Sequence, residues 1–161
     1  MIIMRRIRNK FTNPRTSWDT DGIKERKGIS KEYGLRRRKE ILIAQEILRN
    51  FRRRARDLTA HKDEAKKKAL LDKLVKLGLL KEGQGLDDVL ALMINNILER
   101  RLQTLVWKKG LAKTPKMARQ LITHGKVTVS QKLVKSPSYI VPTGEEGMIS
   151  LRGEQPKEVS A

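Results

Sequence analysis

Residues 100–135 constrain the fold of this chain most strongly, because they contain ten Lys or Arg and no Asp or Glu. The stretch is interrupted by Gly110, by Thr114-Pro115 and by Gly125, which are residue types that commonly end or begin helices. A folded module with a purely cationic surface needs an anionic partner. Nucleic acid is the commonest such partner, because each phosphate that is neutralised releases a condensed counterion.

The first helix of this stretch is expected to begin at Asn96. Asn96 and Glu99 form a capping-box pattern, and Gly110 can end the helix just after Lys109. Side chains three and four residues apart share one face of a helix. We therefore expect one basic face of this helix to contact nucleic acid, through Arg100, Arg101, Thr104 and Lys108.

The second helix is expected to begin at Thr114-Pro115, because Thr is a good N-cap and Pro suits the first helical position. Its apolar and polar residues fall on opposite halves of the helical wheel. Helix N-termini attract phosphate, and a Gln can also read a base edge or a 2′-hydroxyl. The predicted nucleic-acid contacts of this helix and its flanks are Lys113, Thr114, Lys116, Arg119, Gln120, Thr123, His124 and Lys126.

Beyond Gly125 the hydrophobic period changes to two, which predicts three or four short strands. The sheet is expected to pack under the two helices and to hold the angle between them. Gly144 and Gly147 are placed in the last turn. The residues that show the period are Val127, Val129, Leu133, Tyr139, Val141, Met148, Ile149 and Leu151.

The N-terminal half of the chain is predicted to be mainly helical. Residues 1–18 have no hydrophobic period and form a basic extended arm. Helices are expected at 19–33, with Gly34 as the stop, at 36–60, and at 62–77 with Gly78 at its end. The longest of them carries an apolar stripe of Ile41, Ala44, Ile47, Leu48, Phe51, Ala55 and Leu58.

Two basic regions, residues 1–76 and 100–135, flank a nearly neutral apolar segment at 77–99. This distribution indicates two contact surfaces on one polyanionic partner. In the first region, the cations of the arm and an arginine cluster in the long helix are predicted to bind phosphate. These residues are Arg5, Arg6, Arg8, Lys10, Arg52, Arg53, Arg54 and Arg56.

Nothing in the sequence favours an enzyme, a metal site or a cofactor. The chain has no cysteine, and its two histidines, His61 and His124, lie in different segments. No Gly-rich loop ending in Lys-Ser or Lys-Thr is present, and no apolar run approaches the roughly 20 residues that span a membrane. The formal net charge of +19 therefore favours nucleic acid over a membrane or a small-molecule substrate.

Residues 100–151 resemble the RNA-binding domain named after small-subunit ribosomal protein S-four. That domain also occurs in pseudouridine synthases and in tyrosyl-tRNA synthetases, so the domain alone leaves the function open. The matching phrases are Arg100-Arg101-Leu102, Gly110-Leu111-Ala112, Ala118-Arg119-Gln120-Leu121-Ile122, His124-Gly125-Lys126-Val127-Thr128-Val129 and Pro137-Ser138-Tyr139-Ile140-Val141.

The flanking sequence is similar to the archaeal and eukaryotic form of that ribosomal protein itself, and its length suits the archaeal form. The resemblance covers roughly residues 8–152. Its phrases are Lys10-Phe11-Thr12-Asn13-Pro14 followed by Trp18, then Lys31-Glu32-Tyr33-Gly34-Leu35-Arg36, Phe51-Arg52-Arg53-Arg54-Ala55-Arg56 and Ile97-Leu98-Glu99-Arg100-Arg101-Leu102-Gln103-Thr104.

The chain departs from the pattern of that family at two turns. Ser130-Gln131 stands where the family often has Asn-Gly, so a different type of turn is expected there. Gly144-Glu145-Glu146-Gly147 replaces the usual Gly-Asp before the last strand. Neither departure touches the basic helix face.

The resemblance implies a structural, non-enzymatic component of the small ribosomal subunit in the cytoplasm. Such a protein is a primary binder of small-subunit ribosomal RNA, nucleates assembly of the subunit body and supports translational accuracy. Its implied further partners are neighbouring small-subunit ribosomal proteins and messenger RNA near the entry path.

Pattern and resemblance together predict an α+β fold. A mainly helical N-terminal region is followed by a small RNA-binding domain with a helix-turn-helix and short antiparallel strands. The predicted division is an arm at 1–18, a helical region at 19–95, the RNA-binding domain at 96–152 and a tail at 153–161.

Two other functions fit parts of the sequence. A free RNA-binding chaperone, or an accessory protein of RNA modification, would use the same domain and would bind RNA through residues 96–152 alone. A general DNA-compacting protein would bind duplex DNA and ribosomal RNA with similar affinity at matched salt.

Overall fold

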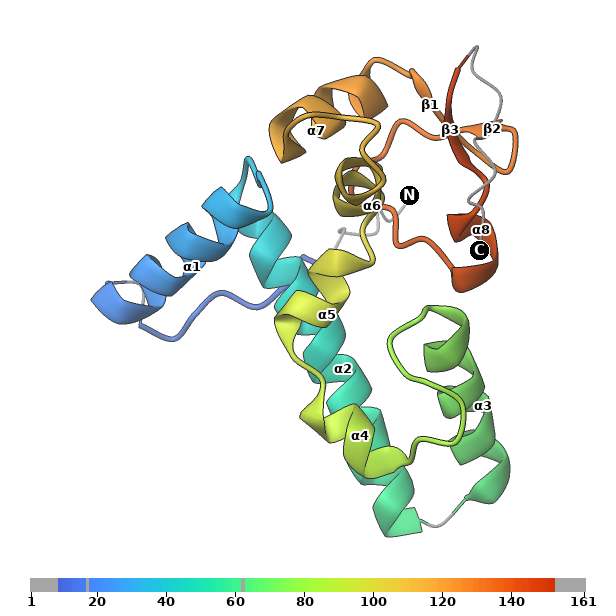
Figure 1. Ribbon diagram of the computed structural model, residues 1–161. Helices are drawn as coiled ribbons and strands as arrows, with labels where there is room; N and C mark the ends of the chain where they lie inside the picture. Colours follow the sequence, from blue (N-terminus) through green and yellow to red (C-terminus); the bar gives the residue numbers. More distant parts are fainter. Residues whose placement is uncertain (1–8, 17, 62, 153–161) are drawn as a thin grey trace, which may run out of the picture.

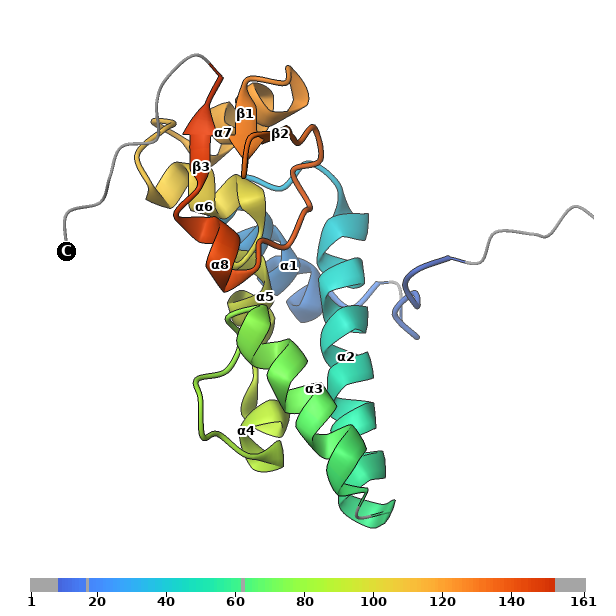
Figure 2. The ribbon, with the colours of Figure 1, turned by 90° about the vertical axis from the view of Figure 1, so that its right-hand side faces the viewer.

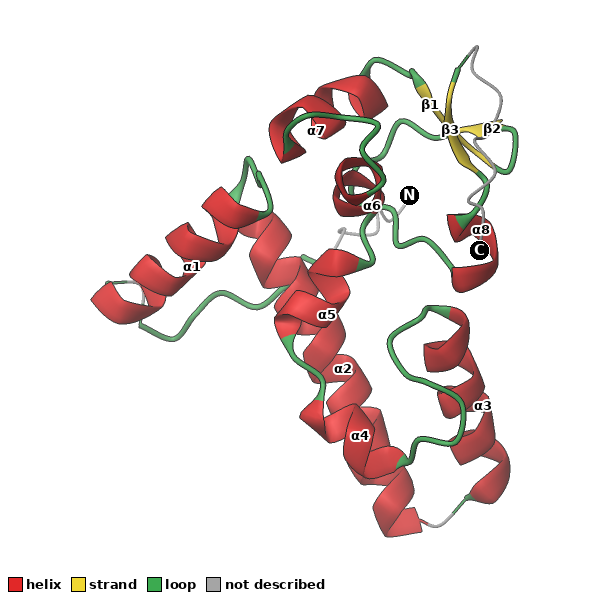
Figure 3. Ribbon diagram, in the orientation of Figure 1, coloured by secondary structure: helices red, strands yellow, loops and turns green. Residues whose placement is uncertain are grey.

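The computed structural model describes residues 9–16, 18–61 and 63–152. Within this part of the chain, helices fill the N-terminal region and short strands appear near the C-terminal end (Figures 1 and 3). This arrangement confirms the predicted α+β class. The elements are α1 (Thr20–Glu32), α2 (Arg38–His61), α3 (Glu64–Lys76), α4 (Leu86–Ala91), α5 (Ile94–Glu99), α6 (Leu102–Lys108), α7 (Pro115–Thr123), β1 (Val127–Val129), β2 (Lys132–Leu133), α8 (Thr143–Glu146) and β3 (Ile149–Leu151).

Helices α1 and α2 meet at a sharp corner. Gly34 ends α1 as predicted, with a φ of +60°, a left-handed conformation that Gly adopts without a Cβ penalty. Helix α2 is the long helix expected at 36–60, and most of its apolar stripe is buried. Helix α1 has no buried residue. The corner and α2 therefore connect this end of the chain to the rest of the molecule (Figure 1).

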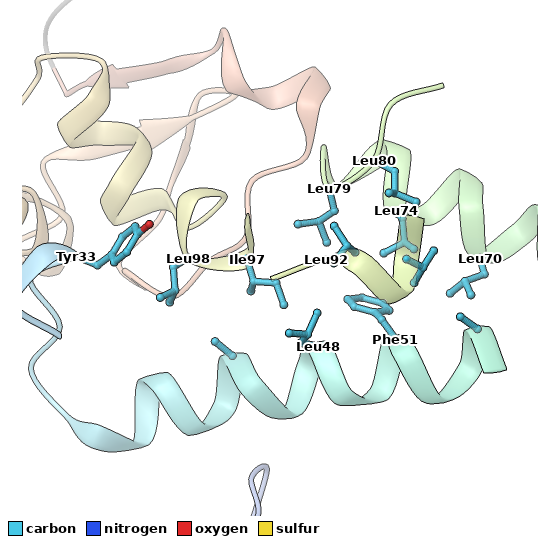
Figure 4. Close-up of a cluster of buried hydrophobic side chains, with 13 residues drawn as sticks. Tyr33, Leu48, Phe51, Leu70, Leu74, Leu79, Leu80, Leu92, Ile97 and Leu98 are labelled. Atoms are coloured by element: carbon cyan, nitrogen blue, oxygen red, sulfur yellow. The ribbon is translucent and has the colours of Figure 1, made fainter. Parts of the chain in front are cut away.

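The first hydrophobic core lies between α2 and the helices α3, α4 and α5 (Figure 4). Leu48 and Phe51 of α2 pack in the same cluster as Leu74 of α3 and Leu98 of α5. Leu74 and Leu98 are fully buried, and burying such a side chain is worth about 1.5–3 kcal/mol. Gly78, with a φ of +66°, ends the turn after α3 as the sequence predicts.

The second hydrophobic core lies between α6, α7 and the sheet. Val106 of α6, Ile122 of α7 and Val127 of β1 are fully buried in it, together with Ile149 of β3. The sheet thus packs against the two helices, as expected, and Figure 2 shows it beside them. Because these side chains are rigidly packed, the angle between α6 and α7 is held by the sheet.

The prediction of one helix from Asn96 to Lys109 is wrong. Asn96 lies inside α5, which ends at Glu99, and α6 begins only at Leu102 with Arg101 as its N-cap residue. The expected capping box at Asn96 is therefore absent.

The break between α5 and α6 has a tertiary cause. The Leu102 N–H donates to the Tyr139 carbonyl oxygen at 2.7 Å, and the Val141 N–H donates to the Arg100 carbonyl oxygen at 3.0 Å. Residues 139–141 thus take hydrogen bonds that a continuous helix would have made internally. They form an isolated bridge to this break and not the separate strand expected from the period-two pattern.

The three strands form an antiparallel sheet in the order β2-β1-β3. Val129 pairs with Lys132, so Ser130 and Gln131 make a two-residue turn, with φ values of +48° and +65°. Two left-handed residues are the mark of a type I′ turn, the one that Asn-Gly favours. The expectation of a different turn type is therefore wrong. The segment around Gly144 forms the short helix α8 and not a simple turn.

Residues 9–16 contain no helix or strand, and Thr12 Oγ1 donates to Glu46 Oε2 on α2 at 3.2 Å. Residues 1–8 and 17 of the predicted arm lie outside the described residues, as does the predicted tail. The division into four segments remains a prediction. Ile97 and Leu98 belong to the first core and Leu102 to the second, so the two cores meet at the α5–α6 break.

Candidate nucleic-acid interface

Helix α7 presents a row of exposed polar side chains. Thr114 Oγ1 accepts the Met117 N–H at 3.2 Å, which confirms the predicted N-cap. No acidic residue occurs in α7 or its flanks, so the exposed face is cationic. The predicted contacts that lie exposed here are Lys113, Thr114, Lys116, Gln120, Thr123, His124 and Lys126.

Arg101 and Arg119 do not belong to that exposed face. Both guanidinium groups bind the same carboxylate oxygen, Oε2 of Glu40 at the start of α2, at 2.6 Å and 3.0 Å. The exposed fractions of the side chains are 5% for Arg101, 22% for Arg119 and 10% for Glu40. The prediction that these two arginines lie on a solvent-facing basic surface is therefore wrong. Their ion pairs with Glu40 connect α2 to α6 and α7 inside the protein.

The charge state of Glu40 follows from this environment. Burial alone raises the pKa of the Glu40 carboxyl, but hydrogen bonds and charges from Arg119 and Arg101 outweigh it and hold the pKa below its ordinary value. Arg101 also donates to Ser138 Oγ at 3.0 Å. Glu40 is thus a carboxylate at neutral pH, and one negative charge is shared between the buried Arg101 and the half-buried Arg119.

Gln103 connects the α1–α2 corner to the start of α7. Its amide nitrogen lies 3.1 Å from the Tyr33 and Gly34 carbonyl oxygens and 3.0 Å from the Pro115 carbonyl oxygen. Its amide oxygen accepts from Arg119 at 3.3 Å. Gln103 is only 1% exposed, so these contacts replace water completely.

The sequence patterns do not predict this role of Gln103. The signal that could have found it is a lone amide in the stretch 102–107, where every other residue except Thr104 is apolar.

The corner packs closely on the first turn of α7. A Cβ placed on Gly34 would lie 2.8 Å from Pro115 Cβ and 3.2 Å from the Lys116 backbone nitrogen. This turn is therefore covered by the corner, and phosphate contacts there fall to side chains and not to open backbone N–H groups.

Three other predicted contacts of the first helix are also engaged in the protein. Thr104 is 3% exposed and donates to the Leu98 carbonyl oxygen. The prediction that Thr104 lies on an exposed, RNA-binding face is therefore wrong. Arg100 forms an ion pair with Glu146 at 2.7 Å and donates to the Val141 carbonyl oxygen. Lys108 is half-exposed and pairs with Glu99 at 3.2 Å. Only Lys108 of this group faces water.

The α1–α2 corner supplies cations that the sequence analysis missed. Arg36, Arg37, Arg38 and Lys39 are all exposed. The backbone just before them is fixed against Gln103 and Pro115, so they lie beside the start of α7. Four consecutive cations were a visible signal, but the sequence could not show that they adjoin a helix about 80 residues further on. We call the exposed side chains of this corner and of α7, from Lys113 to Lys126, the corner–α7 surface.

The arginine cluster of α2 is divided in the same way. Arg53, Arg54 and Arg56 are exposed, whereas Arg52 is half-buried and donates to the Leu92 carbonyl oxygen. Lys10 of the arm is exposed. The predicted contacts Arg5, Arg6 and Arg8 lie outside the described residues.

Other kinds of site have no support within the described ranges. No group of three or more His, Cys, Asp or Glu side chains in them is placed to hold a metal ion. The helices found there are too short or too polar to cross a membrane. The geometry thus offers cationic surfaces as the main feature available for binding.

Comparison with known proteins gives the family. The S4 domain model matches residues 100–146. Small ribosomal subunit protein uS4 of Ignicoccus hospitalis is 45% identical over 155 residues, which cover 94% of this chain and 93% of that protein. The uS4 protein of Methanococcus aeolicus is 46% identical over 94% of this chain and 88% of its own length. The chain belongs to the uS4 family.

This uS4-family membership extends over both halves of the chain. The uS4 protein of Saccharolobus solfataricus is 50% identical over 146 residues, covering 84% of this chain and 81% of that protein. The resemblance to the archaeal form of the ribosomal protein is thereby confirmed. So is the expectation of a ribosomal protein in place of an enzyme.

Proposed function

We propose that this uS4-family chain is a structural component of the small ribosomal subunit that binds small-subunit ribosomal RNA directly. The observation that carries the proposal is the corner–α7 surface, which collects cations from two distant segments without a carboxylate among them. RNA phosphates are the ligand that such a surface fits, because each contact adds counterion release to the Coulomb attraction.

The side chains of the corner–α7 surface favour contacts to RNA phosphates, with a few contacts to base edges or 2′-hydroxyls. Lys113, Lys116 and Lys126 supply point charges, whereas Gln120 can donate to and accept from a base edge or a 2′-hydroxyl. The corner adds planar guanidinium groups, which bind phosphate bidentately. Contacts to the RNA phosphates position the protein, and the few contacts to base edges supply selectivity.

The second basic surface supports a role in assembly. The exposed arginines of α2 lie on a different element from α7, and Glu40 and Gln103 hold the two helices in one arrangement. A rigid protein with two cationic surfaces binds two RNA segments at a set distance. We infer that the chain is a primary binder that nucleates assembly of the subunit body.

Further partners follow from the family resemblance. They are neighbouring small-subunit proteins and messenger RNA near the entry path, and the associated function is support of translational accuracy. The place of action is the ribosome in the cytoplasm.

Sedimentation tests the proposal directly. Native protein should travel with the small ribosomal subunit through a high-salt gradient, because a component with many buried phosphate contacts does not dissociate as a loosely bound protein does. Filter binding at one fixed salt should show tighter binding to small-subunit ribosomal RNA than to duplex DNA of equal length. Recovery only at the top of the gradient, with equal affinity for both nucleic acids, would contradict the proposal.

A further inference from the structure

A groove runs along α2 beside the start of α5, away from the corner–α7 surface. Its volume is about 600 Å³. The walls are both cationic and apolar, because three of the lining residues are arginines and three are apolar. The lining residues that matter here are Gln45, Leu48, Arg49, Arg52, Arg56 and Met93.

The arginines of the groove have few ion-pair partners among the described residues. Arg49 pairs with Glu46 at 2.8 Å, but its side chain is 60% exposed, so this contact is weak. Among the described residues, no carboxylate lies within ion-pair distance of Arg52 or Arg56. The groove therefore holds a net positive charge that an anionic ligand would neutralise.

Arg52 is fixed in place at the wall of the groove. One terminal nitrogen of its guanidinium group donates to the Leu92 carbonyl oxygen, and its Nε is buried without a hydrogen-bond partner in the described chain. A guanidinium held in one orientation offers a flat, charged face on which a planar group stacks at little entropic cost.

The apolar part of the groove is unusual for a surface this basic. Met93 is 66% exposed, whereas Leu48, which also lines the groove, is 7% exposed. A thioether packs well against the edge or face of an aromatic ring. An exposed methionine beside free arginines thus suits a ligand that is both anionic and aromatic.

We propose that this groove holds one unstacked nucleotide of small-subunit ribosomal RNA. Its base lies between Met93 and the Arg52 guanidinium, Gln45 reads the base edge, and Arg49 and Arg56 bind the flanking phosphates. The volume accommodates a nucleotide, and single-stranded RNA is recognised by this combination of stacking, edge contacts and cations. The inference rests on the proposed function, because it takes ribosomal RNA as the partner.

The test uses the full-length chain and small-subunit ribosomal RNA. Ultraviolet irradiation forms zero-length crosslinks, and mass spectrometry identifies the crosslinked peptides. We expect a nucleotide crosslinked to the peptides that contain Gln45 or Met93, in addition to crosslinks on α7. The double variant Arg49→Gln with Arg56→Gln should abolish the groove crosslink and lower affinity about tenfold.

Matched variants separate the groove from general charge. Arg53→Gln with Arg54→Gln removes the same charge from the same helix, but neither residue lines the groove. This control should weaken binding electrostatically and keep the groove crosslink. Met93→Ala should weaken binding about fivefold, whereas Met148→Ala, another exposed methionine, should bind as the parent chain does.

The two proposals fail in different ways. Crosslinks on α7 without any in the groove, together with unchanged affinity for Met93→Ala, would overturn the groove inference and leave RNA binding intact. Failure of the parent chain to bind the ribosomal RNA would overturn the proposed function. Competition of the groove crosslink by an acidic peptide, with no effect on the α7 crosslinks, would assign the groove to a protein partner.

Discussion

The placement of Glu40 explains why Arg101 and Arg119 do not lie on the open basic surface. Its carboxylate pairs with Arg101 and Arg119 at once, and all three side chains are largely shielded from water. A buried ion pair contributes little when compared with an apolar replacement, but removing one partner leaves charge uncompensated. Glu40 therefore acts as a structural residue, and the two arginines are fixed by it.

We expect Glu40→Gln to lower the free energy of unfolding by about 3 kcal/mol, because one buried and one half-buried guanidinium group lose their counter-charge. Urea denaturation followed by circular dichroism measures this. Glu46→Gln, on the same helix but with an exposed partner, is the control and should change stability by under about 1 kcal/mol. Equal losses for both variants would contradict the role assigned to Glu40.

The pH dependence of stability should also reflect the ion pairs of Glu40. The pKa of Glu40 in the folded protein lies below its ordinary value of 4.5. Its ion pairs therefore stabilise the fold fully above that value, and this stabilisation is lost as pH falls through the folded pKa. Melting temperatures measured between pH 7 and pH 2 should fall below about pH 4.5, and the Glu40→Gln variant should show a smaller fall over that window.

The turn at Ser130 and Gln131 is a second residue-scale feature. Both residues occupy the left-handed region, which costs roughly 1 kcal/mol for each residue that is not Gly or Asn. Replacing the pair by Asn-Gly should raise the free energy of unfolding by about 1 kcal/mol, because the turn type already matches. Thermal denaturation tests this, and a destabilised double variant would show that the turn is not type I′. Ser136→Asn, outside the turn, is the control.

At the scale of the element, α7 has two faces with different tasks. Ala118 and Ile122 pack into the second core, and Arg119 reaches back to Glu40. Lys116 and Gln120 face water. The helix thus presents a short exposed row whose position is determined by contacts on its other side.

Because the two faces of α7 differ, a substitution on the exposed face should lower RNA affinity, whereas one on the packed face should lower stability. Lys116→Glu should weaken binding to small-subunit ribosomal RNA at least tenfold and leave the melting temperature nearly unchanged, because the side chain is exposed. Arg119→Glu should lower stability by about 3 kcal/mol, because it places two carboxylates together in a half-buried site. Filter binding and thermal denaturation separate the two effects. A folded Arg119→Glu variant that had lost only RNA binding would restore the original interpretation of Arg119 as a contact.

At the scale of the whole molecule, polar contacts join two hydrophobic cores into one arrangement. Glu40 and Gln103 join α2 and the corner to α6 and α7. On the other side, Thr143 of α8 donates to the last carbonyl oxygens of α3, and Arg100 pairs with Glu146. The cationic surfaces are therefore presented in a set geometry and not on separate modules.

The corner cations should contribute to RNA affinity as α7 does. Arg37→Gln should reduce the slope of log affinity against log salt by about 0.7–0.9, the value for one lost phosphate contact. Lys66→Gln is the control, because Lys66 is exposed on α3 and paired with Asp63. Binding isotherms at several salt concentrations measure both slopes. Equal slopes for Arg37→Gln and the parent chain would remove the corner from the RNA-binding surface.

The sequence by itself determined the local features of this protein. The period of the apolar residues, the N-cap at Thr114 and the stops at Gly34, Gly78 and Gly125 predicted α1, α2, α3 and α7 and the strands of the sheet, because these signals act within a few residues. Its charge distribution and family resemblance predicted an RNA-binding ribosomal protein.

Only the tertiary structure decided which cations remain available to RNA. The helix break at Arg100 depends on hydrogen bonds from residues 139–141. The burial of Arg101 and Arg119 depends on a single carboxylate about 60–80 residues away. A helical wheel assigns a face but not the element that covers it. In this chain the start of α2 packs against Arg101 and Arg119, so these two arginines are largely shielded from solvent. The same packing places the cations of the α1–α2 corner beside α7.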